Sequence, residues 1–274
     1  MSKLDSPKLL VSIRSAREAR IVEQAEIGIL DVKEPDRGGL GASDPETLQE
    51  IADVVSGSNQ NRVLSFSAGE LVQWFPQLEG KDDKPGLEPV CSLVQRYGPE
   101  LLCKYRYVKV GLAGSFRSQA ASLGCEARQS GPIHDWTTIW TQFFEGLPVP
   151  SRAVAVVYLD FQDCDAPPPE EIIRVAAQAN NCDVVLFDTF HKSGNLFSDF
   201  SITEIEEMVL LARSHGLIVV IAGSVDLNCL AEAVSVAPDF VGVRGAVCCG
   251  ERTSQIDSDL VEKFARELGA VVLK

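Results

Sequence analysis

Three lysines and two aspartates stand at or near the ends of apolar runs in the sequence, and their side chains could do nucleophilic and acid–base chemistry. Asp31 and Lys33 close one run, Lys109 lies inside the stretch "YVKVGL", and Asp188 closes another run four residues before Lys192. Residues two apart in a strand point the same way, so Asp31 and Lys33 share a face. A surface ion pair before a loop would explain these two residues alone. The recurrence of the pattern favours a catalytic site.

An amine that lies among other amines and away from water binds its proton less tightly. A lysine that is neutral near pH 7 attacks carbonyl groups and forms a Schiff base, and this is the chemistry that the set of residues predicts. Asp31 and Asp188 would keep the other amines charged and transfer protons. Lys109 is flanked by valines, which favours a position facing an enclosed space. The alternative is an edge position from which its amine reaches water.

A second group of residues has the donors that phosphate requires. Gly223 and Ser224 follow one apolar run, and Arg244 and Gly245 follow the next. Backbone N–H groups in such turns and a guanidinium group both bind phosphate oxygens. Each glycine pair alone is a weak indication, but together with the lysines and the arginine the residues predict a phosphate site. The Arg244 side chain is expected to hold the phosphate.

Eight apolar runs, with a helical segment between successive runs, must position these residues. The runs span residues 9–13, 28–33, 62–67, 107–112, 153–160, 183–188, 217–222 and 240–243. They are nearly continuous in apolar residues, as parallel strands buried on both faces are. Capping boxes at Ser15–Glu18 and Ser201–Glu204 are expected to open two of the helices.

Eight such units in 274 residues, without a shift in composition, predict an α/β fold: a single (β/α)8 TIM barrel, one domain over residues 1–274. If one strand were misassigned, a doubly wound open sheet would be the alternative. In a TIM barrel the active site lies at the carboxyl ends of the strands. Ser67 and Asp160, which also end apolar runs, are then expected near the same mouth as the lysines.

The net charge of −14 argues against nucleic acid or an anionic membrane as the main partner, because both need a basic surface. The charge does not exclude anionic substrates, because a local cationic pocket can exist in an acidic protein. No basic segment followed by an apolar stretch opens the chain, and no apolar run is long enough to span a bilayer. We therefore expect a cytoplasmic protein. The oligomeric state is open, a homo-oligomer included.

The cysteines and histidines predict neither a disulfide framework nor a metal site. None of the eight cysteines forms a C-x-x-C pair, and the three histidines are not spaced like metal ligands. No metal and no cofactor are expected. Cys248 and Cys249 are interpreted as small buried residues, with a metal-binding or redox-active pair as the alternative.

Five motifs carry a resemblance to a known family. They are "LDVKEPDRGGLGA" at 30–42, "YVKVGL" at 107–112, "LFDTFHKSGNLFSDFS" at 186–201, "AGS" at 222–224 and "VGVRGAVC" at 241–248. In these motifs and their order the chain resembles the (5-formylfuran-3-yl)methyl phosphate synthases of methanofuran biosynthesis over essentially its whole length. The two long motifs are specific, whereas "AGS" alone is not. The segments 67–83 and 126–144 depart from the family's pattern, which leaves the lid and the subunit contacts open.

The resemblance implies a (β/α)8 barrel similar to that of class I aldolases. It also implies condensation of two triose phosphates, with glyceraldehyde 3-phosphate as substrate and loss of one phosphate and of water. Lys33 would then be the Schiff-base lysine, and Asp31, Lys109, Asp188 and Lys192 would be the other catalytic residues. The first alternative is another Schiff-base, aldolase-like enzyme that acts on a sugar phosphate. The second is a non-catalytic protein that binds phosphorylated metabolites, for which three lysines would be superfluous.

Overall fold

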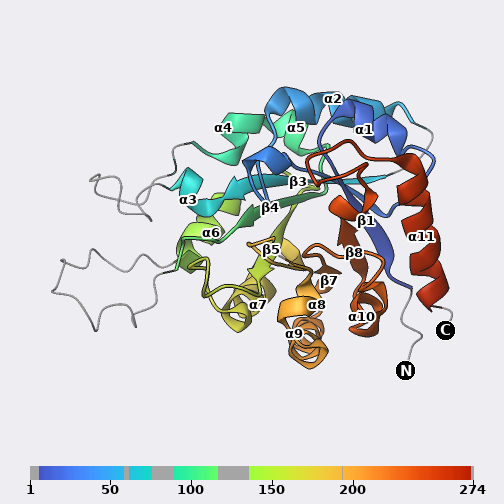
Figure 1. Cartoon of the computed structure of the whole chain (residues 1–274). Helices are drawn as coiled ribbons and strands as arrows, with labels where there is room; N and C mark the ends of the chain where they lie inside the picture. Colours follow the sequence, from blue (N-terminus) through green and yellow to red (C-terminus); the bar gives the residue numbers. More distant parts are fainter. Residues whose placement is uncertain are drawn as a thin grey trace.

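The computed structural model describes residues 6–58, 62–75, 89, 91–116, 136–192 and 194–272, and the statements below concern these residues. Eight strands form a closed barrel in which each strand pairs in parallel with the next and β8 pairs with β1 (Figure 1). The strands are β1 Lys8–Ile13, β2 Ile29–Val32, β3 Val63–Glu70, β4 Tyr107–Gly111, β5 Arg152–Tyr158, β6 Cys182–Asp188, β7 Ile218–Ile221 and β8 Phe240–Val243. The predicted TIM barrel is confirmed.

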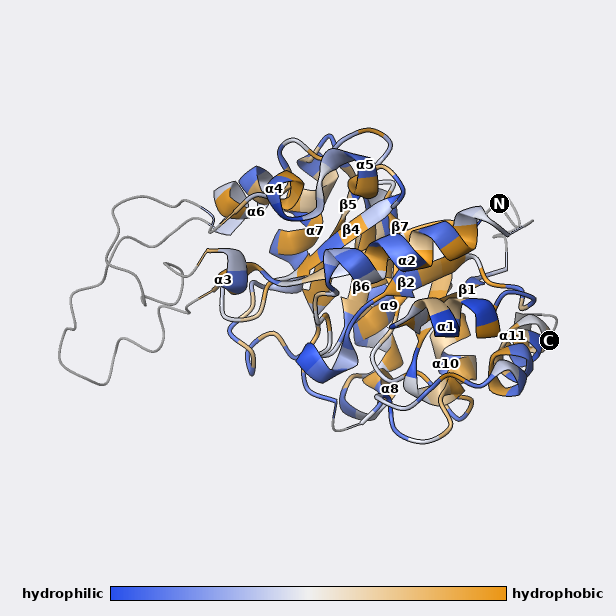
Figure 2. Cartoon of the chain, turned by 90° about the horizontal axis from the view of Figure 1, so that it is seen from above, coloured by the Kyte–Doolittle hydropathy of each residue, from blue (hydrophilic) through white to orange (hydrophobic). Residues whose placement is uncertain are grey.

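Helices surround the barrel and occupy every interval between strands (Figure 1). They are α1 Ala16–Ile21, η1 Pro35–Arg37, α2 Pro45–Ser56, α3 Leu71–Trp74, α4 Leu93–Tyr97, α5 Pro99–Leu102, α6 Trp136–Phe144, α7 Pro169–Gln178, α8 Leu196–Asp199, α9 Ile202–Ser214, α10 Leu230–Ser235, η4 Gly245–Val247 and α11 Ser258–Val272. In Figure 2 apolar residues concentrate in the strands, and the hydrophilic residues of the helices lie mostly on the outside. Burial of these apolar faces is what holds the helices on the barrel.

The two predicted capping boxes have different outcomes. Ser201 and Glu204 form the complete box at the start of α9. At α1, Ser15 accepts a hydrogen bond from the N–H group of Glu18, as expected. The Glu18 carboxylate does not return the bond to Ser15. This carboxylate accepts a hydrogen bond from the N–H group of Arg14 instead, and Glu18 is almost fully buried.

Alternate residues along the strands separate two apolar clusters. Along β1, Leu9 and Val11 pack outward with the helices, whereas Leu10 faces the lumen. Other strands contribute to the lumen cluster in the same way, with Ile29, Val154, Val156, Val184, Leu186 and Val220. This apolar filling supports a layer of polar side chains at the carboxyl ends of the strands, where the barrel opens.

β3 and β5 end at residues other than those that the sequence predicted. β3 continues past Ser67 to Glu70, and its register with β4 shifts between these two residues. Gly69 has a φ of +85°, in the left-handed region that glycine adopts without strain, and so permits this irregularity. β5 ends at Tyr158, and Asp160 lies in the turn that follows.

Among the described helices, none is long and apolar enough to cross a membrane. Of the two stretches in which the sequence left a lid and subunit contacts open, 67–83 and 126–144, residues 76–83 and 126–135 lie outside the described residues.

Candidate active site

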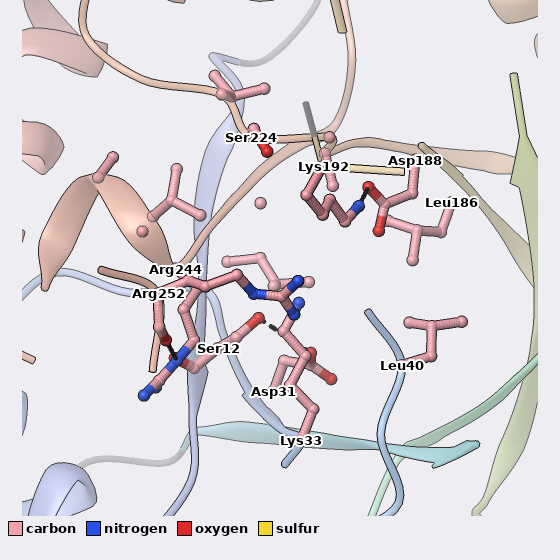
Figure 3. Close-up of a pocket in the computed structure, with 18 of the residues that line it drawn as sticks. Ser12, Asp31, Lys33, Leu40, Leu186, Asp188, Lys192, Ser224, Arg244 and Arg252 are labelled. Carbon is pink, nitrogen blue, oxygen red and sulfur yellow. Dashed lines mark hydrogen bonds and ion pairs between the residues drawn. The ribbon is translucent and has the colours of Figure 1, made fainter. Parts of the chain in front are cut away.

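A cavity of about 340 Å³ opens at the carboxyl ends of the strands (Figure 3). All nine residues predicted for catalysis and phosphate binding line it, namely Asp31, Lys33, Lys109, Asp188, Lys192, Gly223, Ser224, Arg244 and Gly245. The strands and loops of β2, β4 and β6 supply the lysines and aspartates, and the loops after β7 and β8 supply the other four. The fold thus brings together residues that are far apart in the sequence.

Asp31 and Lys109 form a buried ion pair across the lumen. Lys109 Nζ lies 2.6 Å from Asp31 Oδ1, and both side chains are almost fully buried. Ser65 Oγ donates to Oδ1 at 2.6 Å, and Ser12 Oγ donates to Oδ2 at 3.1 Å. Burial alone raises the pKa of Asp31, but the charges of Lys109 and Lys33 and the hydrogen bonds outweigh it and hold this pKa below its ordinary value. Asp31 is therefore ionised at neutral pH.

Asp188 and Lys192 form the second pair. Lys192 Nζ lies 2.5 Å from Asp188 Oδ1 and also donates to the carbonyl oxygen of Thr189. The N–H group of Thr189 donates to the same carboxylate oxygen at 2.8 Å. Burial raises the pKa of Asp188, but the charges of Lys192 and Lys33 outweigh burial and hold this pKa below its ordinary value. Figure 3 shows this pair at the wall of the cavity.

Lys33 lies between the two pairs and differs from both other lysines. It lines the cavity, and its amine makes no hydrogen bond or ion pair with any residue that the structure describes. Burial lowers the pKa of Lys33 from 10.5 to about 8, against Asp188 and Asp31, which raise it. Roughly a tenth of its amines are then neutral at pH 7. An unpaired, partly neutral amine is the group that attacks a carbonyl.

The largest cause of the lowered pKa of Lys33 is burial, whereas the sequence-based expectation gave equal place to repulsion from the other lysines. From the sequence, repulsion from Lys109 and Lys192 is expected to act together with burial. Both lysines do lower the pKa of Lys33, but burial is the largest cause, and the charges of the neighbouring lysines are the smallest of those that act.

The loops after β7 and β8 present backbone donors to the cavity. Gly223 has a φ of +89° and Ser224 a φ of +56°, so both residues have a left-handed backbone conformation. A serine rarely adopts this conformation. Within the described chain, no acceptor binds the N–H groups of Ser224, Gly245 or Ala246, and all three residues line the cavity. Free N–H groups that line a cavity suit an anion such as phosphate.

The Arg244 guanidinium group, which the sequence predicted to hold a phosphate, has all its donors bound to protein groups. Its Nη1 donates to Glu18 Oε2 at 2.7 Å and to the carbonyl oxygen of Ser12 at 2.9 Å. Its Nη2 donates to Glu18 Oε1 and the carbonyl oxygen of Ser254, and its Nε donates to the carbonyl oxygen of Arg252. The side chain is almost fully buried. It fixes the loop after β8 against α1.

Arg252 is the cation that sequence reasoning missed. Its side chain extends over the cavity, whereas that of Arg244 turns away from it (Figure 3). Its Nη2 donates to the carbonyl oxygen of Gly38 at 3.1 Å, and no other bond of its guanidinium group is found among the described residues. Arg252 lies in a polar loop without strand or helix periodicity, so only its distance of a few residues from Gly245 could have indicated it.

Ser67 and Asp160 do not line the cavity. The Ser67 hydroxyl is buried without a hydrogen-bond partner among the described residues. Asp160 accepts hydrogen bonds from the N–H groups of Phe190 and His191 at 2.7 and 2.8 Å. It therefore shapes the loop that carries Lys192 and has no direct place in the site.

The described residues contain no group of three or more His, Cys, Asp or Glu side chains that could hold a metal ion. The interpretation of the neighbouring cysteines as small buried residues holds for Cys248, whose thiol donates to the carbonyl oxygen of Arg244. It does not hold for Cys249, which is exposed.

Comparison with known proteins finds relatives over nearly the whole chain. The sequence model of a family described as 4-HFC-P synthase matches residues 9–265. The (5-formylfuran-3-yl)methyl phosphate synthase of Methanopyrus kandleri is 32% identical over 266 residues, which cover 96% of this chain and 99% of the relative. The protein of the same name from Methanosarcina mazei is 30% identical over 264 residues, which cover 96% of this chain and 100% of the relative.

Solved structures with a similar barrel have much lower sequence identity. KGPDC from Streptococcus mutans has a TM-score of 0.56 at 7% identity, with 97% of this chain and 99% of that chain covered. The 3-hexulose-6-phosphate synthase from Salmonella typhimurium has a TM-score of 0.54 at 13% identity, with 97% and 98% covered. These likenesses support the barrel fold alone.

Proposed function

The chain belongs to the 4-HFC-P synthase family, and on that premise we propose that it condenses two molecules of glyceraldehyde 3-phosphate to (5-formylfuran-3-yl)methyl phosphate for a methanofuran-type cofactor. One observation carries the proposal: Lys33 has a lowered pKa and no hydrogen-bond or ion-pair partner among the described residues, and it lies between two ionised aspartate–lysine pairs. A protein that merely binds phosphate does not need such a group.

The proposed reaction balances without an oxidant or a reductant. Two triose phosphates give one furan phosphate, one inorganic phosphate and two molecules of water. The two substrates and the product have the same overall oxidation level once these losses are counted. Acid–base and imine chemistry therefore suffices for the whole conversion.

Lys33 starts the reaction by attacking the carbonyl carbon of one triose phosphate. A C–N bond forms, the carbonyl oxygen leaves as water, and the resulting imine takes a proton. The protonated imine withdraws electrons and so acidifies the neighbouring C–H group, which loses its proton to a carboxylate. The electron pair then expels phosphate from the next carbon or attacks the carbonyl carbon of the second triose phosphate. Hydrolysis of the imine finally returns the Lys33 amine.

The two ion pairs supply charge and proton transfer on either side of Lys33. Asp31 and Asp188 are ionised, so each can accept a proton from carbon and pass it on. The ammonium groups of Lys109 and Lys192 stabilise the oxygen atoms on which negative charge develops. Because each pair is nearly neutral as a whole, it adds little repulsion to the approach of an anionic substrate.

For the phosphate of the bound triose we propose the free N–H groups of Ser224, Gly245 and Ala246, together with the Arg252 guanidinium group. We propose Arg252 in place of Arg244, because its donors are nearly all free among the residues that the structure describes, whereas those of Arg244 are all used. Arg244 positions the loop that carries Gly245.

Reductive trapping tests the proposal. Incubation with glyceraldehyde 3-phosphate and cyanoborohydride should add one triose unit to the intact mass, and peptide mapping should place it on Lys33. Lys33→Arg keeps the charge but cannot form an imine, so it should lose the adduct and all turnover. Lys104→Arg, a surface lysine paired with Asp53, is the matched control and should behave as the wild type.

The outcomes separate the competing mechanisms. An adduct on Lys109 or Lys192 would mean that this lysine, and not Lys33, forms the imine. No adduct, with turnover that a chelator stops, would replace the Schiff base by a metal-dependent mechanism. Chromatography of the products then distinguishes a furan phosphate from the sugar phosphate that another aldolase-like enzyme would release.

A further inference from the structure

A carboxyl group enters the barrel mouth where β4 has no side chain. Gly111 lies two residues after Lys109 on β4, so both face the lumen. A Cβ atom at Gly111 would collide with the carboxyl group of Glu70, the last residue of β3. Glu70 therefore fills the place, one layer closer to the opening than Lys109, that a larger residue at position 111 would take.

Both carboxyl oxygens of Glu70 have donors, one from β5 and one from the loop after β4. Tyr158 Oη donates to Oε1 at 2.7 Å, and the N–H group of Ala113 donates to Oε2 at 3.1 Å. Tyr158 is buried and pairs with Asp188 in the β5–β6 register. The Glu70–Tyr158 pair thus lies at the level of Asp188, on the β3–β5 side of the mouth. In the strand order of the barrel this side is opposite the loops after β7 and β8.

Glu70 differs in protonation from the two aspartates of the site. Burial raises its pKa to about 7, although the hydrogen bonds from Tyr158 and Ala113 lower it. Of the charged groups that face it, Asp188 raises this pKa and Lys192 lowers it. Near neutral pH, Glu70 is present in both forms, and a carboxyl group with this property can give and take protons.

The proposed function needs an acid that the two ion pairs do not provide. Each loss of water breaks a C–O bond, and the leaving hydroxyl group must receive a proton. Asp31 and Asp188 are already ionised, and the amines of Lys109 and Lys192 are bound to them. Glu70 does not itself line the cavity that holds the lysines and aspartates. If one phosphate lies at the loops after β7 and β8, the second triose unit extends out of that cavity toward the opposite side of the mouth, where Glu70 lies.

We propose that Glu70, held by Tyr158, is the general acid of the water losses that follow condensation, acting on the second triose unit. This inference rests on the proposed function. In each loss, the Glu70 carboxyl group gives its proton to the leaving hydroxyl group, the C–O bond breaks, and water departs. The electron pair of a neighbouring C–H bond forms the C=C bond, and that proton passes to a carboxylate and on to solvent. Glu70 regains its proton from solvent.

Glu70→Gln tests the inference, because glutamine keeps the shape but cannot give up a proton and become a carboxylate. Imine trapping on Lys33 should proceed within about twofold of the wild-type rate, since it precedes the water losses. Furan formation should fall roughly 100-fold, the size of effect that a lost general acid has. In the wild type, furan formation should decline as the pH rises through about 7, and this decline should be absent from the residual activity of the variant.

Tyr158→Phe gives a second test that keeps the carboxyl group. Its hydrogen bond favours the ionised form of Glu70, so its loss should raise the pKa of Glu70. The alkaline decline of furan formation should move to higher pH. Tyr105→Phe is the matched control, because it removes another buried hydroxyl group, which donates to the carbonyl oxygen of Leu48 at 2.7 Å. It should leave the decline in place.

A purely structural role of Glu70 predicts different results. Glu70 also joins β3, β4 and β5, so its loss could reduce activity through stability alone, but it would not move the pH dependence in Tyr158→Phe. An unmoved decline in that variant, or furan formation by Glu70→Gln within twofold of the wild type, overturns the inference. If Glu70→Gln does not fold, the Tyr158→Phe comparison decides. Wild-type protein that forms no imine and no furan overturns the proposed function itself.

Discussion

Replacing Asp188 by asparagine should lower the pH at which Lys33 becomes reactive. Among the charges that act on Lys33, that of Asp188 is the strongest, and it raises the pKa of the amine. The substitution also leaves the Lys192 ammonium group without its carboxylate, which adds repulsion. Both changes favour the neutral form of Lys33, so the direction is the same from either cause.

The size of the effect is bounded by the pKa of about 8 for Lys33 in the folded protein. With the ordinary value of 10.5, roughly one amine in 3,000 would be neutral at pH 7, and with a value of about 8 roughly one in ten is. The substitution can therefore raise the rate of imine formation at pH 7 by roughly tenfold at most. Well above pH 8, where the amine is already neutral, it should have almost no effect.

The assay is the initial rate of the cyanoborohydride-trapped adduct, followed by intact mass across about pH 6 to pH 10 around the pKa of Lys33. Trapping measures the first step, so lost proton transfer by Asp188 later in the reaction does not hide the result. Asp53→Asn, which changes an exposed aspartate outside the cavity, is the control. A wild-type midpoint near 10.5, or a higher midpoint in Asp188→Asn, would refute the reasoning.

Three further predictions follow from the same contacts. Lys33→Met should raise the free energy of unfolding at pH 7, by up to about 3 kcal/mol. The folded pKa of Lys33 is depressed, so the unfolded chain binds more protons between about pH 8 and 10.5, and wild-type stability should rise with pH in that window. Urea unfolding that shows no gain in the variant contradicts this. Arg252→Ala should raise KM for the triose phosphate by roughly 10- to 100-fold with little change in kcat; an unchanged KM would count against Arg252 as the phosphate ligand. Glu18→Gln leaves the buried Arg244 guanidinium group without its counter-charge and should lower the free energy of unfolding by about 3–5 kcal/mol. A loss in urea unfolding below 1 kcal/mol would mean that the pair contributes little.

The fold and the convergence of the lysines and aspartates could be predicted because both depend on local sequence. A run such as the one ending at Asp188 is apolar on both faces, which identifies a parallel strand. Once eight such strands are counted, closure of the barrel brings their carboxyl ends to one mouth. Asp31 and Lys109 then meet although 78 positions separate them, and no contact between them had to be known beforehand.

The partners of the arginines and of Glu70 could not be predicted, because they depend on packing between distant segments. Arg244 follows a strand as a phosphate ligand would, and only the folded structure shows that Glu18 of α1 reaches it. Glu70 belongs to β3 only because the strand continues through a register shift, which no alternation of residues indicates. Arg252 lies in a loop whose conformation is set by its neighbours in space.

The Arg244–Glu18 pair also bears on how the chain folds. The two residues are 226 positions apart, and they join the first helix to the loop after the last strand. We expect a contact between residues so far apart in sequence to form late in folding. Closing so long a loop costs conformational entropy, and this cost is offset only when most of the chain is ordered. Until then Glu18 has no counter-charge and cannot be buried without penalty. We therefore expect closure of the barrel to wait for its eighth unit, which carries Arg244.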